Sequence, residues 1–347
     1  MGSFKDQETR NVVGSSQGVE PSRLGWAIAA CCWIYLLIVF TAWMALRAGD
    51  LWWPATLLLF SPRWLLAIPL LPLALAALCW RRRSLIVVLL ALVLVLGSIM
   101  NFNIPWHTAV SAAPSGMRLR VLTCNMHYGQ PEGPTLERLL TETNPDVVAI
   151  QELRREPFDF FAGKQWHIHH RTGGHFLASR YPIRQTEHLG YQSMTVPGSL
   201  MRYELETPTG PLILFSLHFA SPRESLNETV HLPETGFVEL EDNSAVRWQQ
   251  SENLLRLVEK TTDPVLLVGD FNTPPESAIF RRIWDRYTDA FTAAGWGWGY
   301  TFFNKRTMVR IDHILAGPGW YCERCWVGPN IGSPHHPLLA DLILVQP

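Results

Sequence analysis

The sequence predicts an α/β domain preceded by an N-terminal region of apolar helices. Two observations support this division. From Met117 onward, short apolar runs alternate with helical stretches, and several of these runs end in polar side chains, a pattern typical of layered α/β domains with a site at one rim. Before that point, three long uncharged segments approach the length that crosses a bilayer.

The N-terminal region is predicted to anchor the chain in a membrane. Residues 1–23 are polar and show no apolar period, so we expect a disordered tail. Leu24–Leu46, Trp64–Trp80 and Leu85–Met100 are the three spanning candidates. Because the apolar segments follow one another, a cleavable signal peptide fits poorly. Residues 24–101 are therefore predicted to be a transmembrane region of about three helices.

Basic residues predict the orientation of this region. Arg81–Arg83 lie between the second and third spans, and three more basic residues precede the first. Three spans place both groups on the same side, which the positive-inside rule assigns to the cytoplasm. The domain would then lie on the extracytoplasmic side of a plasma or inner membrane. A further crossing by the short, proline-broken stretch Leu51–Pro62 would reverse this assignment.

Residues 102–116 contain two prolines and a glycine and are predicted to be a linker, so that the domain covers residues 117–347. Within the domain, the patterns favour helices over 134–143 and 245–260, with further strands over 176–179, 201–205, 312–315 and 339–345. The acidic stretch Ala220–Ser244 is interpreted as a long, solvated loop.

The stretch PVLLVGDFNTPPES carries the main candidate residues of the domain. Val265–Val268 is a short apolar run typical of a buried strand, and it places Asp270 and Asn272 in the turn that follows. A carboxylate and an amide two residues apart suit a hydrated metal ion and a phosphate oxygen. An Asx turn that only caps backbone groups is the alternative. Glu276 is expected to open a helix.

Three other apolar runs end in the same way. The run 118–124 ends in Asn125, the run 147–150 in Gln151 and Glu152, and the run 212–217 in His218. Polar residues at the carboxyl ends of buried strands collect on one rim, where ligands usually bind. These side chains are therefore predicted to form one site.

Near the C-terminus, RIDH supplies Asp312 and SPHHP supplies His335 and His336. An aspartate near a histidine can hold the imidazole in one tautomer and stabilise its charged form. The charge balance of the domain argues against nucleic acid as a partner. Residues 117–347 hold 21 basic and 26 acidic side chains, which does not favour bulk binding to nucleic acid phosphates.

The ordered motifs resemble those of the endonuclease/exonuclease/phosphatase (DNase I-like) family, and the resemblance covers about residues 117–347. The motifs are TCN at Asn125, IQEL at Glu152, SRYPI with Arg180, LH at His218, GDFN at Asp270 and Asn272, RIDHIL at Asp312 and SPHHPL at His335. The resemblance implies a four-layer α/β/β/α sandwich. It also implies Mg²⁺-dependent hydrolysis of a phosphate ester, with Mn²⁺ as the alternative ion.

The resemblance also implies roles for single residues. Glu152 would be the principal metal ligand, assisted by Asn125. Asn125 would also bind substrate, together with Arg180 and Asn272, which orients the phosphate. Asp270 would engage the attacking water or the leaving group.

The two histidines complete the implied site. His218 would donate to a phosphoryl oxygen, and His335, oriented by Asp312, would act as the base or as an electrostatic clamp on the phosphate. There is one departure from the family pattern. The family usually has an acid before the last histidine, and Pro334 stands there in this chain. This puts the number of metal ions in doubt and leaves His336 as an alternative imidazole or ligand.

Context favours a membrane-anchored phosphodiesterase or phosphatase that acts on lipid headgroups, in the manner of a sphingomyelinase or a phosphoinositide phosphatase. The tether would hold the site near the bilayer, and the aromatic stretch Gly295–Phe303 could contact lipid. A tethered nuclease is the first alternative, although only scattered basic pairs are present. A non-catalytic membrane protein that keeps the fold is the second. No obligate protein partner is inferred.

Overall fold

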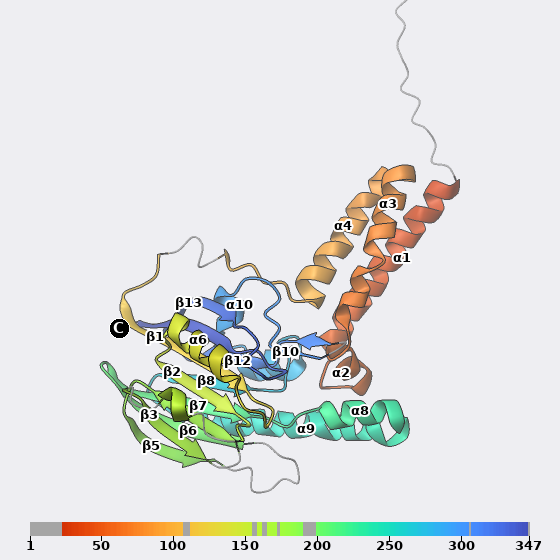
Figure 1. Cartoon of the computed structure of the whole chain (residues 1–347). Coiled ribbons are helices and arrows are strands. Elements are labelled where there is room, and N and C mark those ends of the chain that lie inside the picture. Colours follow the sequence, from red (N-terminus) through yellow and green to blue (C-terminus); the bar gives the residue numbers. More distant parts are fainter. Residues whose placement is uncertain are drawn as a thin grey trace, which may run out of the picture.

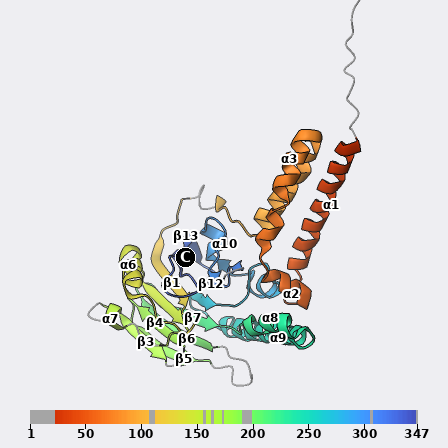
Figure 2. The same ribbon diagram turned by 45° about the vertical axis from the view of Figure 1, so that its right-hand side comes forward.

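The structure, a computed structural model, describes residues 23–106, 112–154, 158–161, 165–171, 174–189, 199–304 and 307–345. A group of apolar helices projects away from an α/β domain (Figures 1 and 2). We call residues 23–106 the helical region. The predicted disordered tail falls on residues 1–23, which lie outside the described residues apart from the last. Part of the predicted linker, residues 107–111, also lies outside them.

The helical region contains three stretches that are long and apolar enough to cross a membrane, Arg23–Leu46, Arg63–Trp80 and Arg82–Ile99. The first is α1 (Arg23–Leu46), the second combines η1 (Arg63–Ala67) with α3 (Leu70–Trp80), and the third combines η2 (Arg82–Ser84), α4 (Leu85–Val93) and η3 (Leu94–Ile99). Between the first two lies α2 (Trp53–Leu59). A helix of that length extends only about 10 Å, so α2 is too short to cross a bilayer.

The outward faces of these helices are apolar. Leu37 on α1, Leu71 on α3 and Ile86 on α4 are each more than 60% exposed. Large apolar side chains at such density on a surface indicate contact with lipid or with another protein. This composition suits a membrane-spanning region, and the sidedness of the domain stays a prediction.

The domain contains two six-stranded mixed sheets. The first has the strand order β13-β14-β1-β2-β4-β3 and the second the order β5-β6-β7-β8-β12-β9. The strands of the first sheet are β1 (Gly116–Asn125), β2 (Val147–Gln151), β3 (His167–Arg171), β4 (His175–Ser179), β13 (Trp320–Val327) and β14 (Leu338–Val345). Those of the second are β5 (Ile183–His188), β6 (Ser199–Thr207), β7 (Gly210–His218), β8 (Val265–Asp270), β9 (Thr288–Asp289) and β12 (Asp312–Ala316).

The sheets pack face to face and are covered by helices, which confirms the predicted four-layer sandwich. Along β1, Leu119 and Val121 point into the core between the sheets, and Leu122 points into the cluster beneath α6 (Gly133–Thr143) and α7 (Phe158–Phe161). The outer face of the second sheet packs on α9 (Pro233–Val258) and η4 (Phe280–Trp284). The remaining elements are α8 (Arg223–His231), α10 (Ala290–Ala294), β10 (Phe302–Phe303) and β11 (Met308–Val309).

Two parallel strand pairs bring polar residues to a common edge. β1 runs parallel to β2, with Asn125 opposite Gln151. β7 runs parallel to β8, with His218 opposite Asp270. The carboxyl ends of all four strands therefore meet at one rim of the sandwich, as expected for parallel neighbours.

The stretch Ala220–Ser244 is not a loop, and the prediction for it is wrong. It forms α8 and most of the first half of α9, a helical hairpin that lies beside α2 (Figure 1). The face of α9 that packs inward carries polar residues at helical spacing, including Asn243, Arg247 and Gln250. Since the prediction relied on apolar periodicity, this polar inner face hid the helix.

The helix predicted to open at Glu276 begins two residues later, at Ala278. Glu276 itself lies in a turn, and its Oε1 atom accepts a hydrogen bond of 2.6 Å from Nη1 of Arg63 in the helical region. Both side chains are buried in this ion pair. The acid at this position therefore joins the domain to the helical region and does not cap a helix.

The assignment of the core between the sheets can be tested by a truncation. Leu214 is fully buried there, so Leu214→Ala is expected to lower the free energy of unfolding by about 2–5 kcal/mol, because it leaves a cavity. Leu232→Ala is the matched control, since Leu232 is 61% exposed and its truncation is expected to change stability by less than about 0.5 kcal/mol. Urea denaturation of the full chain in detergent measures both. Equal losses would contradict the assignment.

Candidate active site

Seven of the predicted site residues converge at the rim where the four strands end. They are Asn125, Glu152, His218, Asp270, Asn272, Asp312 and His335, which come from both sheets. Six of them are less than 9% exposed, and His218 is half-buried. Asn125 and His335 are more than 200 residues apart in sequence, and the direct pairing of β1 with β14 brings them together.

Asn125 links two of the carboxylates. Its Nδ2 atom donates to Oε1 of Glu152 and to Oδ2 of Asp270, both at 2.9 Å. Its Oδ1 atom accepts a hydrogen bond of 2.7 Å from the backbone N–H of His127. The amide nitrogen therefore faces the carboxylates, and the oxygen would reach a metal beside Glu152 only if the amide turned over. A ligand role for Asn125 stays a prediction.

Glu152 and His218 form an ion pair. Glu152 follows β2 with a positive φ of 50°, which turns its side chain back over the end of the sheet. Its Oε1 atom lies 2.9 Å from Nε2 of His218. Burial opposes the charge of Glu152, but the hydrogen bond and charge of His218 outweigh it and lower the pKa of Glu152 to about 2. Conversely, burial lowers the pKa of His218, while Glu152 and Asp270 raise it above its ordinary value.

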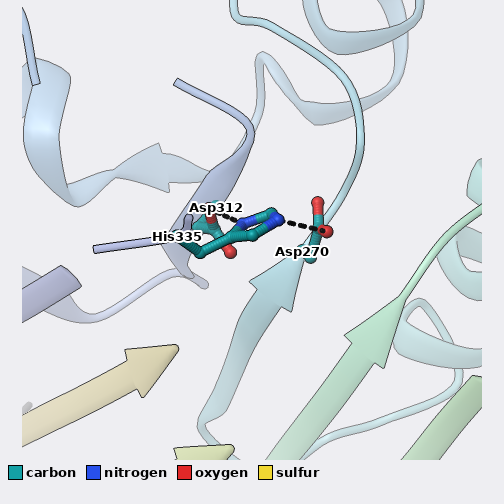
Figure 3. A group of neighbouring side chains, drawn as sticks. All are labelled: Asp270, Asp312 and His335. Atoms are coloured by element: carbon teal, nitrogen blue, oxygen red, sulfur yellow. Dashed lines mark hydrogen bonds and ion pairs between the residues drawn. The ribbon is translucent and has the colours of Figure 1, made fainter. Parts of the chain in front are cut away.

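His335 lies between two aspartates (Figure 3). Its Nδ1 atom is 2.8 Å from Oδ2 of Asp312, and its Nε2 atom is 3.9 Å from Oδ2 of Asp270. Burial opposes the imidazolium, but the charge and hydrogen bond of Asp312 prevail and raise the pKa of His335 to about 9. His335 is therefore positively charged at neutral pH. Its backbone N–H donates to Oγ of Ser333, which in turn donates to the carbonyl of Asn125.

Asp270 is a carboxylate with a raised pKa. Burial and the nearby charge of Asp312 raise the pKa of Asp270 to about 6, against the opposing effect of His335 and His218. A carboxyl group poised close to neutral pH can accept or release a proton during a reaction.

Asn272 is fixed in a left-handed conformation in the turn after β8, with φ of 48°. Its backbone N–H donates to Oδ1 of Asp270 at 2.8 Å, and its Nδ2 atom donates to the carbonyl of Phe219 at 2.9 Å. The carbonyl of Asn272 accepts a hydrogen bond of 3.0 Å from Nη1 of Arg247. An Asx turn is thus present, as the alternative interpretation expected, and it forms part of the same site.

The residues at the rim fit a hard divalent cation. Ligand atoms of Asp270, Asp312 and His335 all lie within 4.8 Å of one another, and Glu152 adds a further carboxylate beside Asp270. Within the part of the chain that the structure describes, Oδ1 of Asp312 is buried without a hydrogen-bond partner. Mg²⁺ and Mn²⁺ prefer such oxygen ligands. The group differs from the predicted ligand pair of Glu152 and Asn125, and the identity of the ion stays a prediction.

Arg180 does not belong to this site, and its predicted role in substrate binding is corrected. β4 runs antiparallel to β2, so His175 lies opposite Gln151 at the rim while Ser179 lies opposite Val147 at the far end. Arg180 follows Ser179 and donates to Oδ1 of Asn144 at 3.2 Å. The antiparallel pairing therefore carries the arginine to the opposite edge of the sheet.

The structure also distinguishes between the two adjacent histidines. His335 points into the cluster, whereas the ring of His336 packs against Phe303 on the other side of the backbone. Burial lowers the pKa of His336. The imidazole of the site is therefore that of His335.

Two residues near the cluster were not predicted. His127 and Arg223 contact each other through Nε2 and Nη1, and both line the cavity above the cluster. His127 lies only two residues after Asn125, so its proximity in sequence was the available signal. Arg223 opens α8, in the stretch that had been interpreted as a loop.

A cavity of about 1380 Å³ opens onto the cluster. Glu152, His218 and His335 lie along one part of its wall. Another part is formed by the hairpin of α8 and α9, and a third by residues of the helical region, namely Leu57, Phe60 and Ser61. The cavity is therefore shared between the domain and the helical region.

Comparison with known proteins agrees with the fold. The sequence profile described as "Endonuclease/Exonuclease/phosphatase family" matches residues 122–335, more than half of the 347 residues. No curated protein matches the chain.

Similar solved structures include a family protein from Bacteroides thetaiotaomicron, with 15% identity and a TM-score of 0.50 over 67% of this chain and 97% of that chain. Truncated TDP2 from Caenorhabditis elegans has 17% identity and a TM-score of 0.50 over 67% and 100%. A family protein from Bacteroides vulgatus has 17% identity and a TM-score of 0.50 over 66% and 99%. At these identities the likeness shows the fold alone.

The pairing of Asp312 with His335 predicts a pH effect that NMR can measure. In metal-free Asp312→Asn, the pKa of His335 is expected to fall from about 9 to near or below the ordinary histidine value of about 6.5. The raised pKa favours the folded state only while His335 is charged. Wild type should therefore lose stability as the pH rises from about 6.5 through about 9, and the variant should lack this loss. A pKa that stays near 9 in the variant would contradict the assignment.

Proposed function

The chain belongs to the endonuclease/exonuclease/phosphatase family and is a metal-dependent hydrolase of phosphate esters; on this premise, we propose that it cleaves the phosphate ester of a membrane lipid headgroup. The observation that carries the proposal is the shared wall of the catalytic cavity. Leu57 and Phe60, from the region predicted to meet the membrane, line the same cavity as Glu152 and His335. A lipid phosphate that enters this cavity can keep its apolar part beside apolar side chains.

The geometry suggests how the side chains would act on the phosphate. Asp312 holds the proton of Nδ1 of His335, so that Nε2 of the charged ring faces Asp270 and can donate to a phosphoryl oxygen. His218 offers a second N–H, which lies 3.9 Å from the same oxygen of Asp270 and contacts Glu152 at 2.9 Å. Asp270, with a pKa of about 6, would take the proton of the attacking water.

A divalent cation bound by the carboxylates would neutralise the phosphate and stabilise the negative charge of the transition state. Glu152 is ionised at neutral pH, since its pKa is about 2, and is ready to bind a cation without losing a proton. We assign the principal ligand role to Glu152, with Asp270 beside the ion as the proton acceptor and Asp312 as the residue that orients His335. Pro334 lines the cavity and supplies no side-chain ligand.

The charge of the cavity supports a lipid over a nucleic acid. Among its described lining residues, Arg223 is the only lysine or arginine, whereas six are acidic. A groove for nucleic acid is expected to be basic. The same balance favours a headgroup with a single phosphodiester over a polyphosphorylated one. The alternative of a non-catalytic protein is set aside, because the family and the assembled side chains indicate an enzyme.

A substrate panel tests the proposal. The purified full chain, in detergent with Mg²⁺, is expected to hydrolyse sphingomyelin or another single-phosphodiester lipid faster than phosphoinositides, single-stranded DNA or double-stranded DNA. Release of the phosphorylated product, measured by mass spectrometry, should stop when EDTA is added and return with excess Mg²⁺. Faster hydrolysis of DNA than of every lipid would overturn the proposal in favour of a nuclease.

Glu152→Gln tests the role of the principal ligand. It keeps the shape of the side chain but removes its charge, so we expect turnover to fall by about 10³-fold or more and the affinity for Mn²⁺ to weaken. Glu137→Gln is the matched control, because Glu137 lies exposed on α6 and its change should leave both quantities unaltered. Circular dichroism checks that both variants are folded. Near-native turnover in Glu152→Gln would refute the assignment.

A further inference from the structure

Besides the ion pair of Arg63 with Glu276, the helical region is docked onto the domain at two places. At the first, Asn103 and Gly297 form a backbone bridge, and Nδ2 of Asn103 donates to the carbonyls of Phe291 and Gly295. At the second, the connection between α1 and η1, residues 47–62, lies on α9 and on the loop after β8. The second contact also reaches the catalytic rim.

Asp50 is the centre of this second contact. It has a positive φ of 66° and is 3% exposed as a residue. Its Oδ1 atom accepts a hydrogen bond of 2.7 Å from Nη2 of Arg247 on α9, and the side chains of this ion pair are both fully buried. The backbone of Asp50 is fixed as well, because its carbonyl accepts from Nε1 of Trp248 and its N–H donates to Oγ1 of Thr56.

Arg247 contacts both Asp50 and the site. While Nη2 binds Asp50, Nη1 donates to the carbonyl of Asn272 at 3.0 Å, and Nε donates to Oδ1 of Asn243 at 3.0 Å. The guanidinium is planar and rigid, so its two ends are placed together. The orientation that Asp50 imposes on one end therefore sets the position of the other end against Asn272.

Asn272 is the residue at the site that Arg247 contacts. Its backbone is left-handed, a conformation that asparagine tolerates better than most residues other than glycine, and its N–H holds Oδ1 of Asp270. A shift of this turn would move the hydrogen bond that orients the catalytic carboxylate. Groups that orient a catalytic or metal-binding side chain in this way typically contribute about 10- to 100-fold to activity or metal affinity.

We propose that Asp50 is a positioning residue for catalysis, acting through Arg247 on Asn272, so that the helical region completes the active site as well as anchoring it. The proposal depends on the phosphoesterase activity of the rim and not on a lipid substrate. It implies that hydrolysis of a small water-soluble phosphodiester also requires the helical region, although such a substrate does not need a membrane.

Asp50→Asn, in the full chain in detergent, tests the proposal. This change keeps the size of the side chain and removes the charge that holds Arg247. For bis(p-nitrophenyl) phosphate, we expect kcat per folded molecule to fall by about 10- to 100-fold while KM changes by less than about threefold. The affinity for Mn²⁺, measured by electron paramagnetic resonance, should weaken several-fold. This second measurement reads the position of Asp270 without any substrate.

Two further variants separate positioning from stability. Asn103→Ala loosens the other docking contact, which is away from the cavity, and should leave kcat and Mn²⁺ affinity within about twofold of wild type. Asp50→Asn combined with Arg247→Met removes both buried charges, which is expected to restore stability but not turnover. Recovery of kcat and Mn²⁺ affinity in the double variant, or equal losses in Asn103→Ala, would overturn the proposal. Lipid selectivity can fail its own test without affecting this outcome.

Discussion

Charged side chains are buried together where β1, β2, β7 and β8 end, and the fold has to compensate their charges. Three carboxylates, those of Glu152, Asp270 and Asp312, are brought close together, and an uncompensated buried charge would cost several kcal/mol. The positive charges of His218 and His335 offset them. At Asp270 the histidines only partly offset burial and the nearby charge of Asp312, so the pKa of this carboxyl is raised. A bound divalent cation would supply the remaining positive charge. The same cation would then stabilise the buried carboxylates and take part in hydrolysis.

The same constraint extends into the helical region. Asp50 and Arg247 form a second buried ion pair, 197 residues apart in sequence, and it lies directly behind the turn that holds Asp270. The joint between the helical region and the domain therefore combines charged and polar groups that have defined partners with aromatic contacts such as Trp53 on Phe237. Apolar contacts alone would allow the two parts to slide, because they are non-directional. Directional hydrogen bonds fix one arrangement, and this arrangement gives the cavity a wall from each part.

The inner face of α9 shows how polar side chains can form a packed layer. Asn243, Arg247 and Gln250 take positions that leucines would occupy in an ordinary amphipathic helix. Each has hydrogen-bond partners in the domain or the helical region, for example the backbone N–H of Ala220 for Gln250 and the carbonyl of Ser221 for Asn243. Burial of such groups is tolerated because their hydrogen bonds are made. The polar inner face contacts the turn of the site through Arg247. Leu254 and Val258, farther along α9, pack in the hydrophobic core.

Local signals were enough to predict the apolar helices, the strands β1, β2, β4, β6, β7, β8, β12 and β14, and the seven candidate residues that the structure brings together. Apolar runs and short motifs are signals of this kind. Tertiary structure alone decided the rest. The antiparallel pairing of β4 with β2 placed Arg180 at the end of the sheet away from the site. Contacts with distant residues turned His335 toward the site and His336 away from it. The tertiary structure also paired Asp50 with Arg247. These outcomes depend on strand direction and on contacts between distant residues, which leave no periodic trace along the chain.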